Sequence, residues 1–162
     1  MILDTFTLVH VLLSLVGIGA GFIVVYGLLT SNRYDRWTAT FLATTTATSV
    51  TGFFFPVHHF MPSHGVGIVS LILLGFAITA RYRRGLAGSW RKIYAVTSVL
   101  ALHLNFFVLV VQSFMKVPWL KALAPTQTEP PFAITQLIVL LTFITLAVLA
   151  AKKFRSEPLQ SF

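Results

Sequence analysis

The stretch TFTLVHVLLSLVGIGAGFIVVYGLLT, residues 5–30, decides the fold class of this chain. A helix that crosses a membrane needs about 20 consecutive apolar residues, and this stretch is longer than that without a charged side chain. No Lys or Arg precedes it, and no small-residue cleavage site follows it at the usual distance. We therefore expect a retained first span rather than a removed signal peptide.

The composition of the whole chain points the same way. Hydrophobic residues make up 56% of the 162 residues, charged residues make up 10%, and the mean hydropathy is +0.85. A soluble domain carries about 25% charged residues, because its surface must stay in water. The net charge of +8 comes from clusters between apolar runs, without an aromatic-interleaved basic face. We therefore expect an integral membrane protein, with a lipid bilayer and no nucleic acid as partner.

The sequence predicts an all-α bundle of about five transmembrane helices. The apolar segments cover about 5–30, 38–60, 64–80, 93–115 and 132–151. The segment 64–80 is the shortest, and whether it crosses fully stays open. We expect a single transmembrane domain over 1–151 and a short basic cytoplasmic tail over 152–162. The connection 116–131 contains Trp119 between two prolines, which favours a short helix lying at the outer interface.

The basic residues predict the orientation of the bundle. Only Lys116 and Lys121 of the 12 basic residues fall on one side of the five spans. The other ten fall on the opposite side, namely Arg33, Arg36, Arg81, Arg83, Arg84, Arg91, Lys92, Lys152, Lys153 and Arg155. By the positive-inside rule the N-terminus lies outside and the C-terminus in the cytoplasm, which requires an odd number of spans. We expect a bacterial inner (plasma) membrane.

One face of the first span is polar or small. His10, Ser14, Gly17 and Gly21 follow the spacing i, i+4, i+7, i+11, which places them on one side of a helix. Small residues in a membrane helix let another backbone, or a flat ligand, approach closely. This face is thus a packing groove or one wall of a cofactor site.

The second polar feature is FFFPVHHFMPSHG, residues 53–65. Pro56 lacks a backbone donor and crowds the preceding turn, so Gly52 and Pro56 should kink or end the second helix there. His58 and His59 follow at once, and His64 begins the next span. The predicted topology brings these histidines and His10 to the outer half of the membrane.

Two ligands suit such a group of imidazoles. Haem b takes two axial histidines from facing helices and needs a small-residue groove, which predicts His10 opposite His58 or His59. The cofactor-binding residues of this hypothesis are His10, His58, His59, Ser14, Gly17 and Gly21. A copper or zinc ion would use three or four imidazoles, from His10, His58, His59 and His64. The third alternative is that no cofactor is bound.

A second site is possible in the fourth span. His103 lies near mid-membrane, where an ionisable residue normally faces the bundle interior and has a partner. Asn105 and Gln112 share the nearly opposite face. His103, Asn105 and Gln112 would form a second site if both faces of this helix are buried.

Other chemistries are poorly supported. The chain has no cysteine, which removes thiolate metal sites and thiol redox chemistry. Its acidic residues, Asp4, Asp35, Glu129 and Glu157, all flank the apolar runs, so a carboxylate relay or di-iron centre is not expected. A lysine for a retinal Schiff base is also missing from the spans.

The leading functional hypothesis is a small membrane redox protein. It would bind haem b near the outer face and pass electrons to or from a quinone or a partner protein. One alternative is a non-enzymatic accessory or assembly subunit of a larger membrane complex, in contact with a pigment of that complex, or a homo-oligomer. Another is a small transporter whose polar path consists of the threonine stripe of the second span and the Asn105 and Gln112 face of the fourth. The threonine stripe is formed by Thr40, Thr44, Thr48 and Thr51, which share one helix face.

Reporter fusions test the predicted topology. Fusions after Arg36, Arg84 and Lys153 should report the cytoplasm, because each follows a basic cluster, and a fusion near Thr126 should report the outside. A cytoplasmic reporter at Thr126 would contradict the topology and the shared depth of the four outer histidines.

Overall fold

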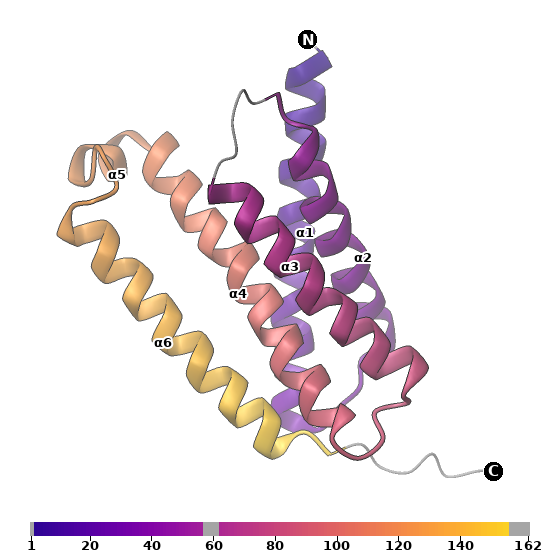
Figure 1. Ribbon diagram of the computed structural model, residues 1–162. Coiled ribbons are helices and arrows are strands. Elements are labelled where there is room, and N and C mark those ends of the chain that lie inside the picture. Colours follow the sequence, from indigo (N-terminus) through magenta and orange to yellow (C-terminus); the bar gives the residue numbers. More distant parts are fainter. Residues whose placement is uncertain (1, 57–61, 156–162) are drawn as a thin grey trace.

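The computed structural model describes residues 2–56 and 62–155, and this part of the chain is helical without strands. Figure 1 shows the long helices side by side, each running opposite to the one before it. The elements are α1 (Ile2–Thr30), α2 (Asp35–Thr51), the 3₁₀ turn η1 (Gly52–Phe54), α3 (Pro62–Ile78), the π-helix η2 (Thr79–Arg83), α4 (Trp90–Lys116), α5 (Pro118–Leu123) and α6 (Pro130–Lys153). The predicted all-helical bundle is confirmed.

In the described part of the chain, four helices are long and apolar enough to cross a membrane. They are α1, α3 together with η2, α4 and α6. The third predicted segment is therefore longer than the sequence suggested, because η2 extends it to Arg83. The helix α2 is shorter than predicted: it ends at Thr51, and Phe55 is extended before Pro56. A proline disfavours the α conformation in the residue before it, which explains the break.

The helix α4 forms the centre of the bundle. In its most apolar 18-residue window 56% of the residues are buried, against 11% in α6. It packs against α1 and α3 on one side and α6 on the other. The short helix α5 occupies the predicted place in the connection 116–131, and its Trp119 is exposed.

The small face of α1 packs against protein. A Cβ built on Gly21 would lie 2.5 Å from Leu102 of α4 and 3.0 Å from Phe41 of α2. A Cβ on Gly17 would lie 2.9 Å from the hydroxyl oxygen of Thr45. The glycines therefore set how closely α1 approaches both neighbours.

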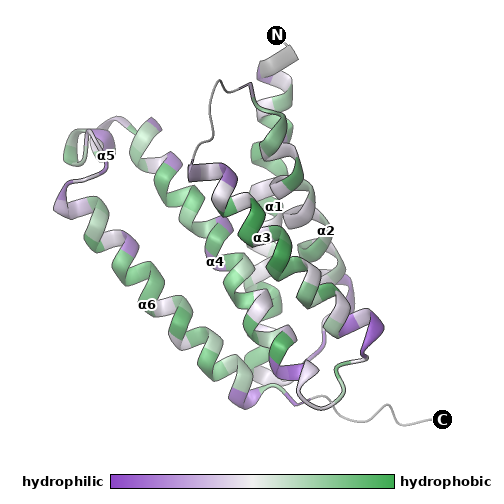
Figure 2. Ribbon diagram, viewed as in Figure 1, coloured by the Kyte–Doolittle hydropathy of each residue, from purple (hydrophilic) through white to green (hydrophobic). Residues whose placement is uncertain are grey.

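The two ends of the bundle differ in charge. The end of α1, the start of α2, the loop from η2 to α4 and the end of α6 lie together, and they carry the ten basic residues that the sequence placed on one side. We call this end the basic end. The start of α1 and α5 lie at the opposite, N-terminal end, and Figure 2 shows that the helices between the two ends consist mostly of hydrophobic residues.

A buried arginine joins three elements at the basic end. Arg81 of η2 is 5% exposed, forms an ion pair with Asp35 and donates to the backbone oxygen of Arg33 at 3.2 Å. It also donates to the hydroxyl of Tyr94 at 3.3 Å, and that hydroxyl donates to Thr38 at 3.4 Å. The sequence placed Arg81 only among the ten basic residues of one side. Its guanidinium also joins α2, η2 and α4, because Asp35 lies on α2 and Tyr94 on α4.

Gly21 and Gly19 form a matched pair for testing the packing of α1. A leucine at Gly21 would collide with Leu102 and Phe41, whereas a Cβ on Gly19 meets no atom within 4 Å. Overpacking a core contact costs about 1–3 kcal/mol. We expect Gly21→Leu to lower the thermal midpoint in detergent clearly and Gly19→Leu to leave it within about 1 °C, since a lipid-facing site changes little. Equal midpoints for both variants would contradict the packing.

Candidate functional site

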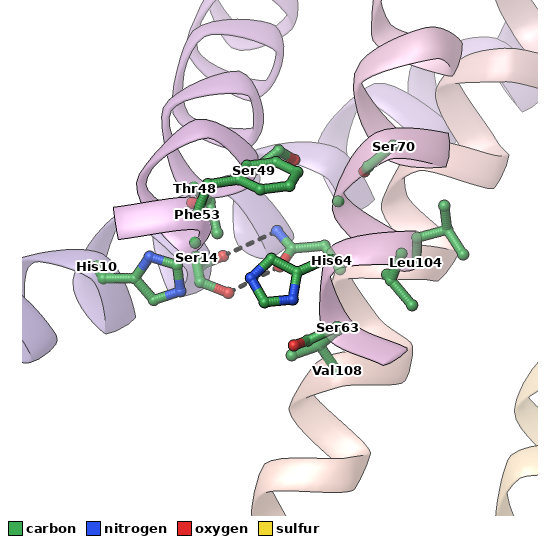
Figure 3. A pocket seen from close by; sticks show the side chains of 14 residues that line it. His10, Ser14, Thr48, Ser49, Phe53, Ser63, His64, Ser70, Leu104 and Val108 are labelled. Atoms are coloured by element: carbon green, nitrogen blue, oxygen red, sulfur yellow. Dashed lines mark hydrogen bonds between the residues drawn. The ribbon is translucent and has the colours of Figure 1, made fainter. Parts of the chain in front are cut away.

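A pocket with two imidazole rings lies at the N-terminal end, between α1, α2, η1, α3 and α4. Its volume is about 110 Å³. We call it the histidine pocket and define it by His10, Ser14, His64 and Asn105, which all line it. Figure 3 shows both imidazole rings at this pocket, His10 from α1 and His64 from α3. Its apolar wall consists of Phe53, Val66, Leu104 and Val108.

The tautomer of His10 follows from its neighbour. The Nδ1 atom of His10 lies 2.8 Å from the hydroxyl oxygen of Thr51. That hydroxyl already donates its hydrogen to the backbone oxygen of Ala47 at 2.7 Å. While that bond is made, the hydroxyl accepts from His10, and we therefore assign the imidazole hydrogen to Nδ1. The Nε2 atom is left as an acceptor, the form that binds a metal or a donor group of a ligand.

Ser14 and Asn105 join α1 to α4 beside this ring. Ser14 donates to the Oδ1 atom of Asn105 at 2.8 Å, and the Nδ2 atom of Asn105 donates to the backbone oxygen of Ser14 at 3.4 Å. Asn105 is only 7% exposed. Because an amide nitrogen carries two hydrogens, Asn105 keeps one further donor beyond the bond to Ser14.

Aromatic side chains of the break after α2 orient both imidazoles. The ring of Phe55 meets His10 edge-on, with centroids 5.0 Å apart and planes at 85°. The ring of Phe53 lies 5.6 Å from that of His64. The chain break that the sequence predicted therefore also shapes the wall of the pocket.

The structure does not place the complete predicted ligand sets. His58 and His59 lie outside the described residues, so the haem pair of His10 with either of them stays a prediction. Within residues 2–56 and 62–155 no group of three or more His, Cys, Asp or Glu side chains could hold a metal ion. The copper or zinc site from His10, His58, His59 and His64 therefore also stays a prediction.

The small-residue face divides into two parts. Its upper half, His10 and Ser14, lines the histidine pocket. Its lower half, Gly17 and Gly21, faces Thr45, Phe41 and Leu102. The lower half is thus filled by protein side chains and provides no open groove for a flat ligand.

The residues of the predicted second site lie apart. Asn105 belongs to the histidine pocket, whereas His103 packs on the other side of α4, with its ring 5.2 Å from that of Phe143. Gln112 is exposed further along α4. His103 is 9% exposed, and its Nε2 atom has no hydrogen-bond partner in the described part of the chain. The structure therefore does not assemble a second site from these three residues.

Sequence reasoning missed the partners that complete the pocket. Thr51 and Thr48 were seen only as members of a threonine stripe, and the pairing of Asn105 with Ser14 carried no local signal. The threonines of that stripe do bond back to their own helix, as Thr44 and Thr48 illustrate.

Comparison with protein-family models, curated proteins and solved structures finds no match. The geometry of the histidine pocket is therefore the basis for proposing a function.

Thr51→Val tests the tautomer of His10. Wild-type protein should show the hydrogen on Nδ1 in ¹⁵N spectra of labelled histidine, because the Thr51 hydroxyl accepts while it donates to Ala47. Thr51→Val removes that acceptor and should shift the population toward the Nε2–H form. Thr48→Val is the control, since the Thr48 hydroxyl donates to its own helix at Thr44, whereas the hydroxyl that bonds to His10 belongs to Thr51. A wild-type ring protonated on Nε2 would contradict the assignment.

Proposed function

We propose that the chain is a five-span membrane protein that binds the head group of a lipid-soluble quinone at its N-terminal, outer end. In this proposal it is the quinone-binding part of a redox system and exchanges electrons with a partner protein. The observation that carries the proposal is that two hydrogen-bonding groups of the histidine pocket are each held in place by a neighbour and still offer one further bond, the Nε2 atom of His10 and one N–H of Asn105.

The fifth span of the proposal is α2 together with η1. Residues 35–54 are long enough, at 1.5 Å per residue, for about 30 Å, the thickness of a bilayer core. Its threonine hydroxyls donate to carbonyls of the same helix, for example Thr40 to Arg36 and Thr44 to Thr40, which lowers their cost in lipid. With α2 as a span, all clusters of the basic end fall on one side, which supports an N-terminus outside and a C-terminus in the cytoplasm.

The volume of the histidine pocket favours a quinone ring over haem b. A cavity of about 150 Å³ is known to hold a benzene ring. The histidine pocket, at about 110 Å³, is smaller than that cavity, so it could take at most one six-membered ring. A tetrapyrrole is several rings wide, so haem b would need side chains of the pocket to move aside. The quinone side of the predicted redox role therefore fits the described pocket better than the haem side.

The polar groups of the pocket match a quinone and its reduced form. A quinol hydroxyl can donate to the Nε2 atom of His10, and a quinone oxygen can accept from the free N–H of Asn105. Both groups are held in place, His10 by Thr51 and Asn105 by Ser14. Such pre-organisation lowers the entropy lost on binding. The apolar wall with Phe53 and Val66 suits the ring, and the isoprenoid tail would lie in lipid.

The test is the quinone content of protein purified in mild detergent. Organic extraction and chromatography should recover quinone from wild-type protein, and added short-chain quinone should bind with a dissociation constant below about 1 mM. Asn105→Leu removes the free donor and His10→Phe removes the acceptor, so each should weaken binding about tenfold, the cost of one hydrogen bond. Gln112→Leu is the matched control, because Gln112 is an exposed amide on the same helix.

Two outcomes would contradict the quinone proposal. One is wild-type protein that neither carries nor takes up quinone. The other is equal weakening by Gln112→Leu, which would mean that detergent partitioning was measured. A Soret band that disappears in His10→Ala would instead favour the haem b site, and its absence after haem supplementation would remove that site.

A further inference from the structure

A second cavity lies at the basic end, far along the bundle from the histidine pocket. Its volume is about 390 Å³, and it lies between the start of α4 and the end of α6. We call it the basic pocket. It is lined by Arg91, Lys92, Ala151, Lys152 and Arg155. Four of its five lining residues are thus cationic.

These four charges are not neutralised within the described part of the chain. Among the described residues, the acidic residue at this end is Asp35, which pairs with Arg81 and not with the pocket. Residues 2–56 and 62–155 contain no ion pair to Arg91, Lys92, Lys152 or Arg155. Four like charges around one cavity repel one another, so an anion in the cavity would lower the energy of the arrangement.

The helix dipole explains the position of Lys152 but not the positions of Arg91 and Lys92. Lys152 lies in the last turn of α6, where a cation is stabilised by the helix dipole. Arg91 and Lys92 lie in the first turn of α4, where the dipole disfavours a cation and favours an anion. The positive-inside rule places basic residues on this side of the membrane, but it does not require them to converge on one cavity.

An apolar strip leads away from the basic pocket along α6. Ile144, Val148 and Lys152 are four residues apart and so share one face of the helix. Ile144 is 45% exposed and Val148 is 47% exposed. A molecule with its anionic end at Lys152 could therefore lay a hydrocarbon chain along this strip.

We infer that the basic pocket binds the head group of an anionic phospholipid of the cardiolipin type, which carries two phosphodiester groups. Each of these anions could lie between two of the four cations, and basic pockets between membrane helices on the cytoplasmic side bind such head groups. A free phosphate would leave most of the 390 Å³ and the apolar strip unused. The choice of a lipid depends on the proposed membrane embedding but not on the quinone proposal, since the two sites lie at opposite ends.

The inference is tested on the full chain in detergent by native mass spectrometry. Tetraoleoyl cardiolipin, phosphatidylcholine and inorganic phosphate serve as the three probes. The test variant is Arg91→Gln with Lys152→Gln. The control is Arg83→Gln with Lys153→Gln, which removes the same charge from exposed residues that do not line the pocket. Thermal midpoints of both variants establish that each remains folded.

Wild-type protein should retain cardiolipin in preference to phosphatidylcholine. The test variant should bind cardiolipin about 30-fold more weakly, because two cations near the phosphates are lost, while the control should stay within about threefold of wild type. Equal weakening in both variants would overturn the site and leave only a diffuse surface charge. Competition by inorganic phosphate at the same phosphate concentration would overturn the lipid as occupant, and equal retention of phosphatidylcholine would overturn head-group recognition.

Discussion

The close approach of α1 to α2 and α4 is the contact on which the described pocket depends. Lipid is as apolar as a leucine side chain, so helices in a membrane associate through packing and hydrogen bonds rather than through the hydrophobic effect. At Gly17 and Gly21 the neighbouring side chains fill the space that a Cβ would take. One and two turns further along the same face, Ser14 and His10 are polar, and there the helices enclose a cavity instead of a packed contact.

The second requirement is that polar groups inside the bundle find partners. In an apolar surrounding an unpaired donor or acceptor costs several kcal/mol, so most described threonines bond back to their own helix. Asn105 and Ser14 satisfy each other across two helices. These bonds leave the Nε2 atom of His10 and one N–H of Asn105 as groups of the histidine pocket that can still bond. These remaining groups have fixed positions, because Thr51 bonds to His10 and Ser14 bonds to Asn105.

The bundle has two ends with opposite chemistry. The N-terminal end offers a small pocket with one acceptor and one donor, sized for a single ring. The basic end offers a larger cavity that is rich in positive charge. At the basic end, Arg81 shows that a cation can also have a structural role, since its partners lie on α2 and α4. The proposed ligand role therefore falls on Arg91 and Lys152, for which residues 2–56 and 62–155 provide no ion pair.

The sequence by itself determined the helical class, the alternation of the helices and the asymmetry of charge, because apolar length and basic clusters are local properties of the chain. It also predicted the break after α2 at Gly52 and Pro56, since proline acts on its own turn. Only the tertiary structure decided that Asn105 joins Ser14 while His103 faces Phe143. A helical period places residues on a common face, but the neighbour of that face is set by helix packing between residues far apart in the chain. For the same reason the small face of α1 was recognisable in the sequence, whereas its division into a packed half and a pocket half was not.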